Sequence, residues 1–132
     1  MRLFSIDTET ALIARGRQVP PLACLTWAEL DLTSLGRQPR ILGKGIFDRH
    51  AWRGFLLPLL DDPSVHLCGG NIGFDVLVTS GRWPNPDPDG PSYDEDVLRR
   101  WVAAFDADRV TDLLTRQKLL DLAAGCYRRE QL

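Results

Sequence analysis

The stretch that decides the fold stands at the start of the chain and reads Arg2-Leu3-Phe4-Ser5-Ile6-Asp7-Thr8-Glu9-Thr10. Residues 2–7 alternate between β-forming and polar types, a pattern typical of a strand with one face against a core. Residues 22–30 and 40–47 have the same strand-like character. Because the connections between the three segments are short, we predict an antiparallel meander of three successive strands.

The pattern changes to helical spacing after the third segment. Residues 49–60 place apolar side chains on one helical face, and Pro58 inside this run predicts a kink or an early stop. Residues 65–68 have the composition of a short buried strand, which Gly69-Gly70 is expected to break. Residues 72–80 are predicted to form a helix that ends at Gly81.

The last third of the chain is predicted to be mainly helical. Ser92 with Glu95 three residues later forms a capping-box pattern at the start of a helix. A brief strand is predicted at 108–110, followed by a helix capped by Thr111 or Asp112. Gly125 fits the end of that helix.

The order of these segments predicts one α/β domain that spans residues 1–132. Three strands, a helix, a strand, two helices, a brief strand and a final helix favour a mixed sheet flanked by helices. A formal net charge of −2 argues against a generic basic nucleic-acid binder but leaves open an enzyme whose metal ions contact phosphate.

The sequence also indicates the cellular setting. Cys24, Cys68 and Cys126 are far apart and form no CxxC pair, so neither a zinc site nor a disulfide framework is expected. No apolar run approaches the roughly 18–20 residues that span a membrane. Asp7 follows the start too soon for a signal peptide. We therefore expect a cytoplasmic protein without membrane contact.

Asp7 and Glu9 form the first candidate site. Side chains two apart on a strand point to the same face, so these carboxylates are predicted to lie together. A divalent cation such as Mg²⁺ prefers oxygen ligands of this kind and would offset their repulsion. A solvated pair of surface acids is the simpler interpretation, although the pair ends an apolar strand.

A second candidate site follows the strand at 65–68 and reads Asn71-Ile72-Gly73-Phe74-Asp75. If this strand neighbours the first one, Asp75 lies beside Asp7. Asn71 is interpreted as a helix cap, or as an amide that bonds nucleic acid or a catalytic carboxylate. Asp75 on its own is equally an ordinary first-turn acid, stabilised by the helix dipole.

Taken together, these motifs resemble the DEDD exonucleases of the RNase H-like fold. The resemblance rests on Asp7-Thr8-Glu9-Thr10 and on Asn71 to Asp75, with support from Val110-Thr111-Asp112-Leu113-Leu114 and from residues 118–125. It is closest to the proofreading domain of family A DNA polymerases, especially phage-type ones. It implies an RNase H-like mixed sheet and 3′–5′ hydrolysis of DNA during replication.

The resemblance also implies roles for individual residues. Asp7, Glu9 and Asp75 would be catalytic acids that bind two Mg²⁺ or Mn²⁺ ions, with Asp7 between the ions. The two ions would activate water and stabilise the leaving 3′ oxygen. The single-stranded 3′ end of DNA would contact a set of residues around these acids: Thr8, Thr10, Leu12, Ile13, Asn71 and Phe74.

The sequence departs from the family pattern in one respect. The family's fourth acid lies in a Tyr-x-x-x-Asp or His-x-x-x-Asp motif on a later helix, and nothing here matches that motif. Tyr127 is followed four residues later by Gln131, and Tyr93 by Val97. We therefore expect a fragment, split gene product or truncated chain with weak or absent activity alone. Its partners would be a polymerase domain or the missing C-terminal segment. The alternative is a non-catalytic domain that binds single-stranded nucleic acid or a protein.

Overall fold

A single sheet and four helices make up the described part of the chain. The computed structural model describes residues 1–11, 20–33, 40–81 and 93–125. The elements are β1 (Arg2–Thr10), β2 (Leu22–Asp31), β3 (Arg40–Asp48), α1 (Trp52–Asp61), β4 (Val65–Gly69), α2 (Ile72–Ser80), α3 (Glu95–Asp106), β5 (Val110–Asp112) and α4 (Leu113–Ala123).

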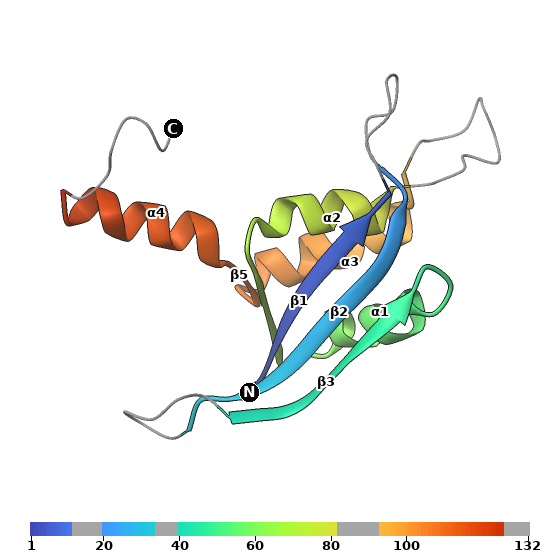
Figure 1. Ribbon diagram of the computed structural model, residues 1–132, viewed down its shortest axis with the longest axis horizontal. Coiled ribbons are helices and arrows are strands. Elements are labelled where there is room, and N and C mark those ends of the chain that lie inside the picture. Colours follow the sequence, from blue (N-terminus) through green and yellow to red (C-terminus); the bar gives the residue numbers. More distant parts are fainter. Residues whose placement is uncertain (12–19, 34–39, 82–92, 126–132) are drawn as a thin grey trace.

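The five strands form a mixed sheet in the order β3-β2-β1-β4-β5 (Figure 1). β1 pairs antiparallel with β2, and β2 pairs antiparallel with β3, which confirms the predicted meander. β4 runs parallel to β1, and β5 runs parallel to β4. The α/β class and the mixed sheet are therefore confirmed, and the first strand does neighbour the strand predicted at 65–68.

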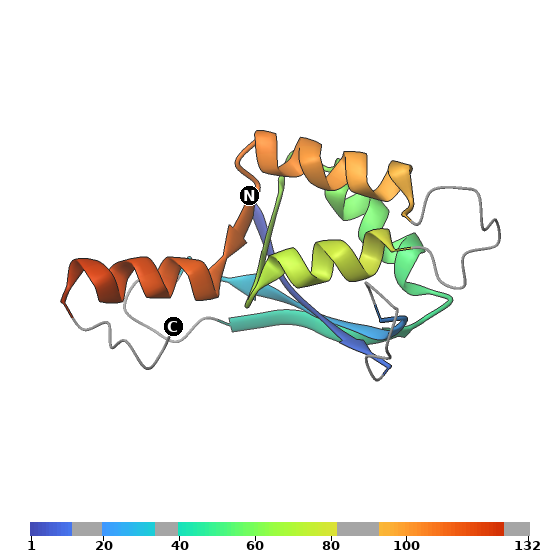
Figure 2. The same cartoon turned by 90° about the horizontal axis from the view of Figure 1, so that it is seen from above.

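Three helices cover one face of this sheet. Figure 2 shows α1, α2 and α3 on the same side of the strands, whereas α4 extends away from the sheet. The strands follow this division, because in β1 the side chains of Phe4, Ile6 and Thr8 are buried and those between them are more exposed. Among the described residues, no helix lies on the opposite side, which we call the open face.

The hydrophobic core fills the space between the sheet and α1–α3. It takes Phe4, Ile6, Leu25 and Leu67 from the strands and Leu56 and Leu60 from α1. Trp101 of α3 is 0% exposed, and its indole Nε1–H donates to Thr79 Oγ1 of α2 at 2.9 Å. This bond satisfies the one polar atom of the largest core side chain, so α2 and α3 are joined by both packing and a hydrogen bond.

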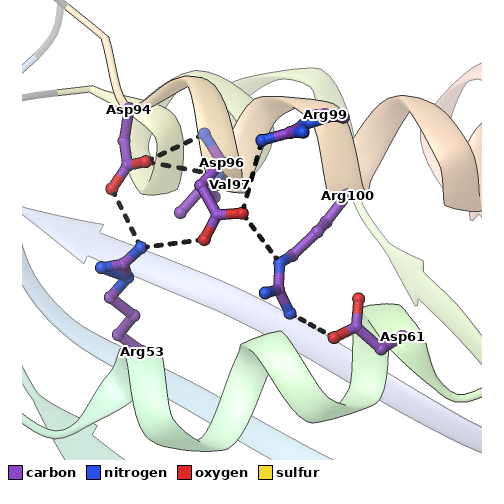
Figure 3. A network of polar contacts seen from close by, with 7 residues as sticks. All are labelled: Arg53, Asp61, Asp94, Asp96, Val97, Arg99 and Arg100. Atoms are coloured by element: carbon purple, nitrogen blue, oxygen red, sulfur yellow. Dashed lines mark hydrogen bonds and ion pairs between the residues drawn. The ribbon is translucent and has the colours of Figure 1, made fainter.

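A network of charged side chains joins α1 to α3 on the outside of the helical layer (Figure 3). Arg53 of α1 forms ion pairs with Asp94 and Asp96, each at 3.3 Å. Arg100 of α3 contacts Asp96 at 3.3 Å and also pairs with Asp61. Such partly exposed pairs are individually weak, but sharing the carboxylate of Asp96 fixes the position of one helix relative to the other.

Several predicted boundaries shift. α1 begins at Trp52 and continues through Pro58 to Asp61, so the predicted early stop is wrong. β4 includes Gly69 and breaks only after it. The N-cap of α3 is Asp94, whose carboxylate accepts from the N–H groups of Asp96 and Val97, while the predicted cap Ser92 lies outside the described residues.

The short strand β5 starts two residues later than predicted. Asp108 precedes it with a φ of 55°, a left-handed conformation that turns the chain after α3. Asp112 is the N-cap of α4 and accepts from Thr115 N at 3.0 Å, as predicted. Gly125 follows that helix with a φ of 70°, which agrees with its predicted place at the helix end. No helix in the described ranges is long and apolar enough to cross a membrane.

Candidate functional site

Asp7 and Glu9 lie on the open face of the sheet near the end of β1. Their side chains are exposed, and Thr8 between them is 5% exposed and points into the helical layer. The strand alternation therefore places both carboxylates on one face, as the i, i+2 spacing predicts. Neither acid is covered by a described helix, so both are accessible to a ligand that approaches the open face.

Asp75 meets β1 at the point where its parallel partner has ended. The last pair between β1 and β4 is Ser5 with Cys68, so the β4 side of Thr8 lacks a neighbouring strand. Asp75 Oδ1 accepts from the backbone N–H of Thr8 at 2.9 Å and from Thr8 Oγ1 at 2.6 Å. The carboxylate thus replaces the strand carbonyl that would otherwise satisfy this buried donor.

Asp75 is also electrostatically coupled to Asp7. Asp75 is only 1% exposed, and this burial raises the pKa of its carboxyl group. The hydrogen bonds from Thr8 oppose the shift, and the negative charge of Asp7 raises the pKa further. The structure therefore brings Asp75 to Thr8, the residue next to Asp7, from 67 positions away in the sequence.

Gly69 makes this approach possible. A Cβ atom at Gly69 would lie 2.9 Å from the Ile6 carbonyl oxygen and 2.9 Å from Ile72 Cδ1. It would also lie 3.7 Å from Asp75 Oδ2. From the sequence, the Gly69-Gly70 pair is expected only to break the strand. Its position directly before Asn71 was the signal that a close backbone contact was needed at the site.

Asn71 occupies the N-cap position of α2, but not in the predicted manner. Its φ of 58° and ψ of 51° are left-handed, and its side chain makes no capping hydrogen bond. Because that bond is absent, the predicted side-chain cap is wrong. Instead its backbone N–H donates to Asp112 Oδ1 at 3.3 Å, which connects the ends of β4 and β5.

The other predicted contact residues that the structure describes are Thr8, Thr10 and Phe74. Thr8 donates its hydroxyl hydrogen bond to Asp75, and Thr10 is half-buried at the end of β1. Phe74 is half-buried on α2, next to Asp75. Leu12 and Ile13 lie outside the described residues. Among those predicted contacts that the structure describes, Thr8 alone has a hydrogen bond to a predicted acid.

The donor chemistry of these acids fits a hard divalent cation, but their number falls short of the set that the resemblance implies. Within the described ranges, no group of three or more His, Cys, Asp or Glu side chains is gathered closely enough to hold a metal ion. The carboxylate of Asp75 bonds Thr8 on the helical side of β1, whereas Asp7 and Glu9 are exposed on the open face. We therefore derive no catalytic step through a pair of ions.

Comparisons with known proteins add no assignment. Neither a family model, nor a curated protein, nor a solved structure matches the chain.

The raised pKa of Asp75 predicts a pH-dependent stability. A raised carboxyl pKa contributes stability that is present below its ordinary value of 3.8 and is lost as the pH rises through the folded value. We expect Asp75→Asn, which keeps an oxygen acceptor for Thr8, to become more stable relative to the wild type as the pH rises above 3.8. Urea unfolding of both proteins across this range measures the difference.

The matched control for this prediction is Asp7→Asn. Removing the charge of Asp7 lowers the pKa of Asp75, so the pH dependence should begin at lower pH in this variant. If the stabilities of the wild type and Asp75→Asn run parallel over the whole range, the pKa of Asp75 is not raised and the described burial of its carboxyl group is wrong.

Proposed function

We propose that this chain is a nuclease module of the RNase H-like type that acts on the single-stranded 3′ end of DNA. The observation that carries the proposal is the contact between Asp75 and Thr8 beside Asp7. It joins two sequence motifs, through Thr8 of the first and Asp75 of the second, at the edge where β4 stops.

The sheet supports the same proposal. The order β3-β2-β1-β4-β5, with an antiparallel first half and a parallel second half, is the arrangement expected of an RNase H-like domain. In open α/β sheets, ligands bind outside the carboxyl ends of the strands. The carboxyl ends of β1 and β4 are where Asp7 and the segment leading to Asp75 lie.

Each acid has a separate part in the proposed activity. Asp7 and Glu9 face outward and would bind Mg²⁺ or Mn²⁺. Asp75 holds the end of β1 through Thr8 and adds negative charge beside Asp7. A bound divalent cation would supply an activated water and would stabilise the charge that develops on the leaving oxygen. This activity would serve proofreading by a DNA polymerase.

A second candidate function is a non-catalytic RNase H-like domain that binds single-stranded nucleic acid or a protein partner. Two observations favour it: Asp75 Oδ1 is already occupied by two hydrogen bonds from Thr8, and the described side chains do not complete a metal site. Residues that act as a catalytic unit lose most of their effect when one is missing. We therefore expect weak or absent cleavage by the 132-residue chain.

Calorimetric titration with Mn²⁺ tests the metal-binding part of the proposal. We expect binding to the wild type and an affinity at least about tenfold lower for Asp7→Asn, since an amide oxygen lacks the charge that attracts the ion. Asp106→Asn is the matched control, because Asp106 is an exposed acid at the end of α3, away from β1. Absence of Mn²⁺ binding in the wild type would refute a metal-dependent nuclease and favour the second candidate.

Release of nucleotides from 3′-labelled single-stranded DNA in Mn²⁺ tests the activity itself. Cleavage by the wild type that is lost in Asp7→Asn and kept in Asp106→Asn supports the exonuclease. Equal cleavage by all three proteins points to a contaminating nuclease. Mn²⁺ binding without cleavage supports a module that holds the ion but needs a further catalytic group.

A further inference from the structure

Lys44 of β3 is a cation that the fold leaves unpaired. Arg2 and Arg40, the other cations on the strands, each form an ion pair with an acid of β2. The ammonium group of Lys44 is exposed and has neither an ion pair nor a hydrogen bond with any residue that the structure describes. It is therefore available to an anion that approaches the sheet from solvent.

Lys44 lies on the open face and lines a shallow hollow there. The hollow has a volume of about 490 Å³ and lies across β1, β2 and β3. Three short side chains, those of Ser5, Thr26 and Ala28, also line it, and Asp7 lines it on β1. The register places Lys44 opposite Ala28, and Thr26 opposite Asp7, in adjacent rows of the same face. No described helix covers this side of the strands (Figure 2).

The backbone that carries Lys44 is held in place from the other face of the sheet. A Cβ atom at Gly43 would lie 3.3 Å from Trp27 Cη2, and one at Gly45 would lie 2.8 Å from Trp27 Nε1. The indole ring thus packs directly against β3 on both sides of Lys44. Glycine inside a strand often marks such a close approach. The packing of Trp27 therefore explains both glycines and fixes the position from which the Lys44 side chain extends.

The hollow itself carries no excess of negative charge. Asp7 and Lys44 are the two charged residues that line it. Glu9 lies two residues beyond Asp7 on β1, outside the lining. The carboxylate of Asp48, at the end of β3, accepts two backbone N–H groups of the following turn. An anionic ligand can therefore reach Lys44 without a second acid beside it.

We propose that the hollow and Lys44 bind the backbone of a single-stranded nucleic acid, with Lys44 on a phosphate upstream of the 3′-terminal one. This inference rests on the proposed nuclease function, because it extends the site at Asp7 across the sheet. Neighbouring strands are about 4.8 Å apart, so Lys44 on β3 and Asp7 on β1 are separated by on the order of 10 Å. That separation assigns Lys44 to the incoming strand and not to the ion.

An apolar side chain beside the hollow suits the same ligand. Ile46 is 66% exposed and lies opposite Thr26, on the same face as Lys44. A base or sugar that covers it would remove apolar surface from water. Surfaces that bind single strands combine cations along the backbone with contacts to the bases. Lys44 and Ile46 would supply one contact of each kind.

Fluorescence anisotropy with a 5′-labelled oligothymidylate tests the role of Lys44. EDTA in the buffer prevents metal-dependent cleavage during the measurement. We expect Lys44→Gln to weaken binding roughly two- to fivefold, the range for one exposed ion pair. The slope of log affinity against log salt should become smaller by about 0.7, the value for one phosphate contact on a single strand. Lys118→Gln, at an exposed and unpaired lysine of α4, is the matched control and should change neither quantity.

A second variant tests the hollow without changing any charge. Ala28→Leu would fill the space between Lys44 and Asp7, and we expect weaker binding of the same oligonucleotide. Ala103→Leu, at an exposed alanine of α3, adds the same atoms elsewhere and should bind as the wild type does. Circular dichroism verifies that both variants are folded. Equal binding by Ala28→Leu and the wild type would show that the strand does not lie in the hollow.

The same phosphate is present in RNA, so oligouridylate should lose affinity by the same factor in Lys44→Gln. A loss confined to one of the two strands would overturn the phosphate contact, because it would indicate a sugar or base. The inference also fails if the wild type binds neither strand, or if Lys44→Gln binds as well as the wild type.

Calorimetry with Mn²⁺ separates this inference from the proposed function. Mn²⁺ binding combined with no effect of Lys44→Gln would leave the ion site intact and overturn the hollow as the path of the strand. An effect of Lys44→Gln without Mn²⁺ binding would support the hollow and favour the non-catalytic domain.

Discussion

Replacing Trp101 with alanine is expected to lower the free energy of unfolding by about 3–5 kcal/mol, the range for removing a large aromatic side chain from a core. Trp101 is 0% exposed and belongs to the cluster that α1, α3 and the sheet share. Its removal leaves a cavity and also leaves Thr79 without its indole donor. Urea unfolding of the two proteins measures the change.

Two further variants separate packing from hydrogen bonding at this position. Trp101→Phe keeps a ring but loses the bond to Thr79, and we expect a smaller loss than for alanine. Phe105→Ala, at an aromatic residue on the same helix that is 45% exposed, should cost much less than Trp101→Ala. Similar losses for Trp101→Ala and Phe105→Ala would show that α3 does not pack on the core as described.

Replacing Gly69 with alanine is the second change with a large expected effect. The added methyl group would lie 2.9 Å from the backbone oxygen of Ile6, which cannot move without disturbing the centre of the sheet. Overpacking of this kind typically costs about 1–3 kcal/mol. We expect a loss of unfolding free energy in that range, together with weaker Mn²⁺ binding if Asp7 and Asp75 form the proposed site.

Gly70→Ala is the matched control for this prediction. A Cβ atom at Gly70 meets nothing within 4 Å, so the change should be nearly neutral for stability. Chemical denaturation of the two variants side by side measures the contrast. Equal stability of the two variants would mean that the backbone at Gly69 does not approach Ile6 as closely as the structure has it.

Much of the sheet could be predicted from the sequence because its signals are local. The alternation in residues 2–7 requires only that one face of a strand be buried, and it identified Asp7 and Glu9 as partners on the other face. The N-cap at Asp112 could also be predicted from a local signal, because a short polar side chain directly before a helix typically caps it.

The contacts at the candidate site could not be predicted in this way, because they depend on where two strands stop. The bond between Asp75 and Thr8 exists because the parallel pairing of β1 ends at Ser5, three residues earlier. Nothing in the residues near Asp75 specifies that register. The left-handed backbone of Asn71 is similar, since the same residue would equally serve as a side-chain cap in another context.

The exposure of α4 was also beyond the sequence pattern. Leu113, Leu114, Leu119 and Leu122 were assigned to apolar positions of a helix, which normally predicts burial. Periodicity indicates which side chains of a helix favour burial. It does not indicate whether another part of the same chain packs against them. In the structure the helix leaves the sheet at its edge, and the leucines remain exposed.

The position of β1 between an antiparallel and a parallel neighbour has a consequence for how fast the chain folds. Leu3 pairs with Leu30, 27 residues away (30 minus 3), whereas Arg2 pairs with Val65, 63 residues away (65 minus 2). Contacts between distant residues slow folding, because the loop between them must be ordered before the contact is gained. The β1–β2–β3 meander can form locally, so docking of β4 along β1 should limit the folding rate.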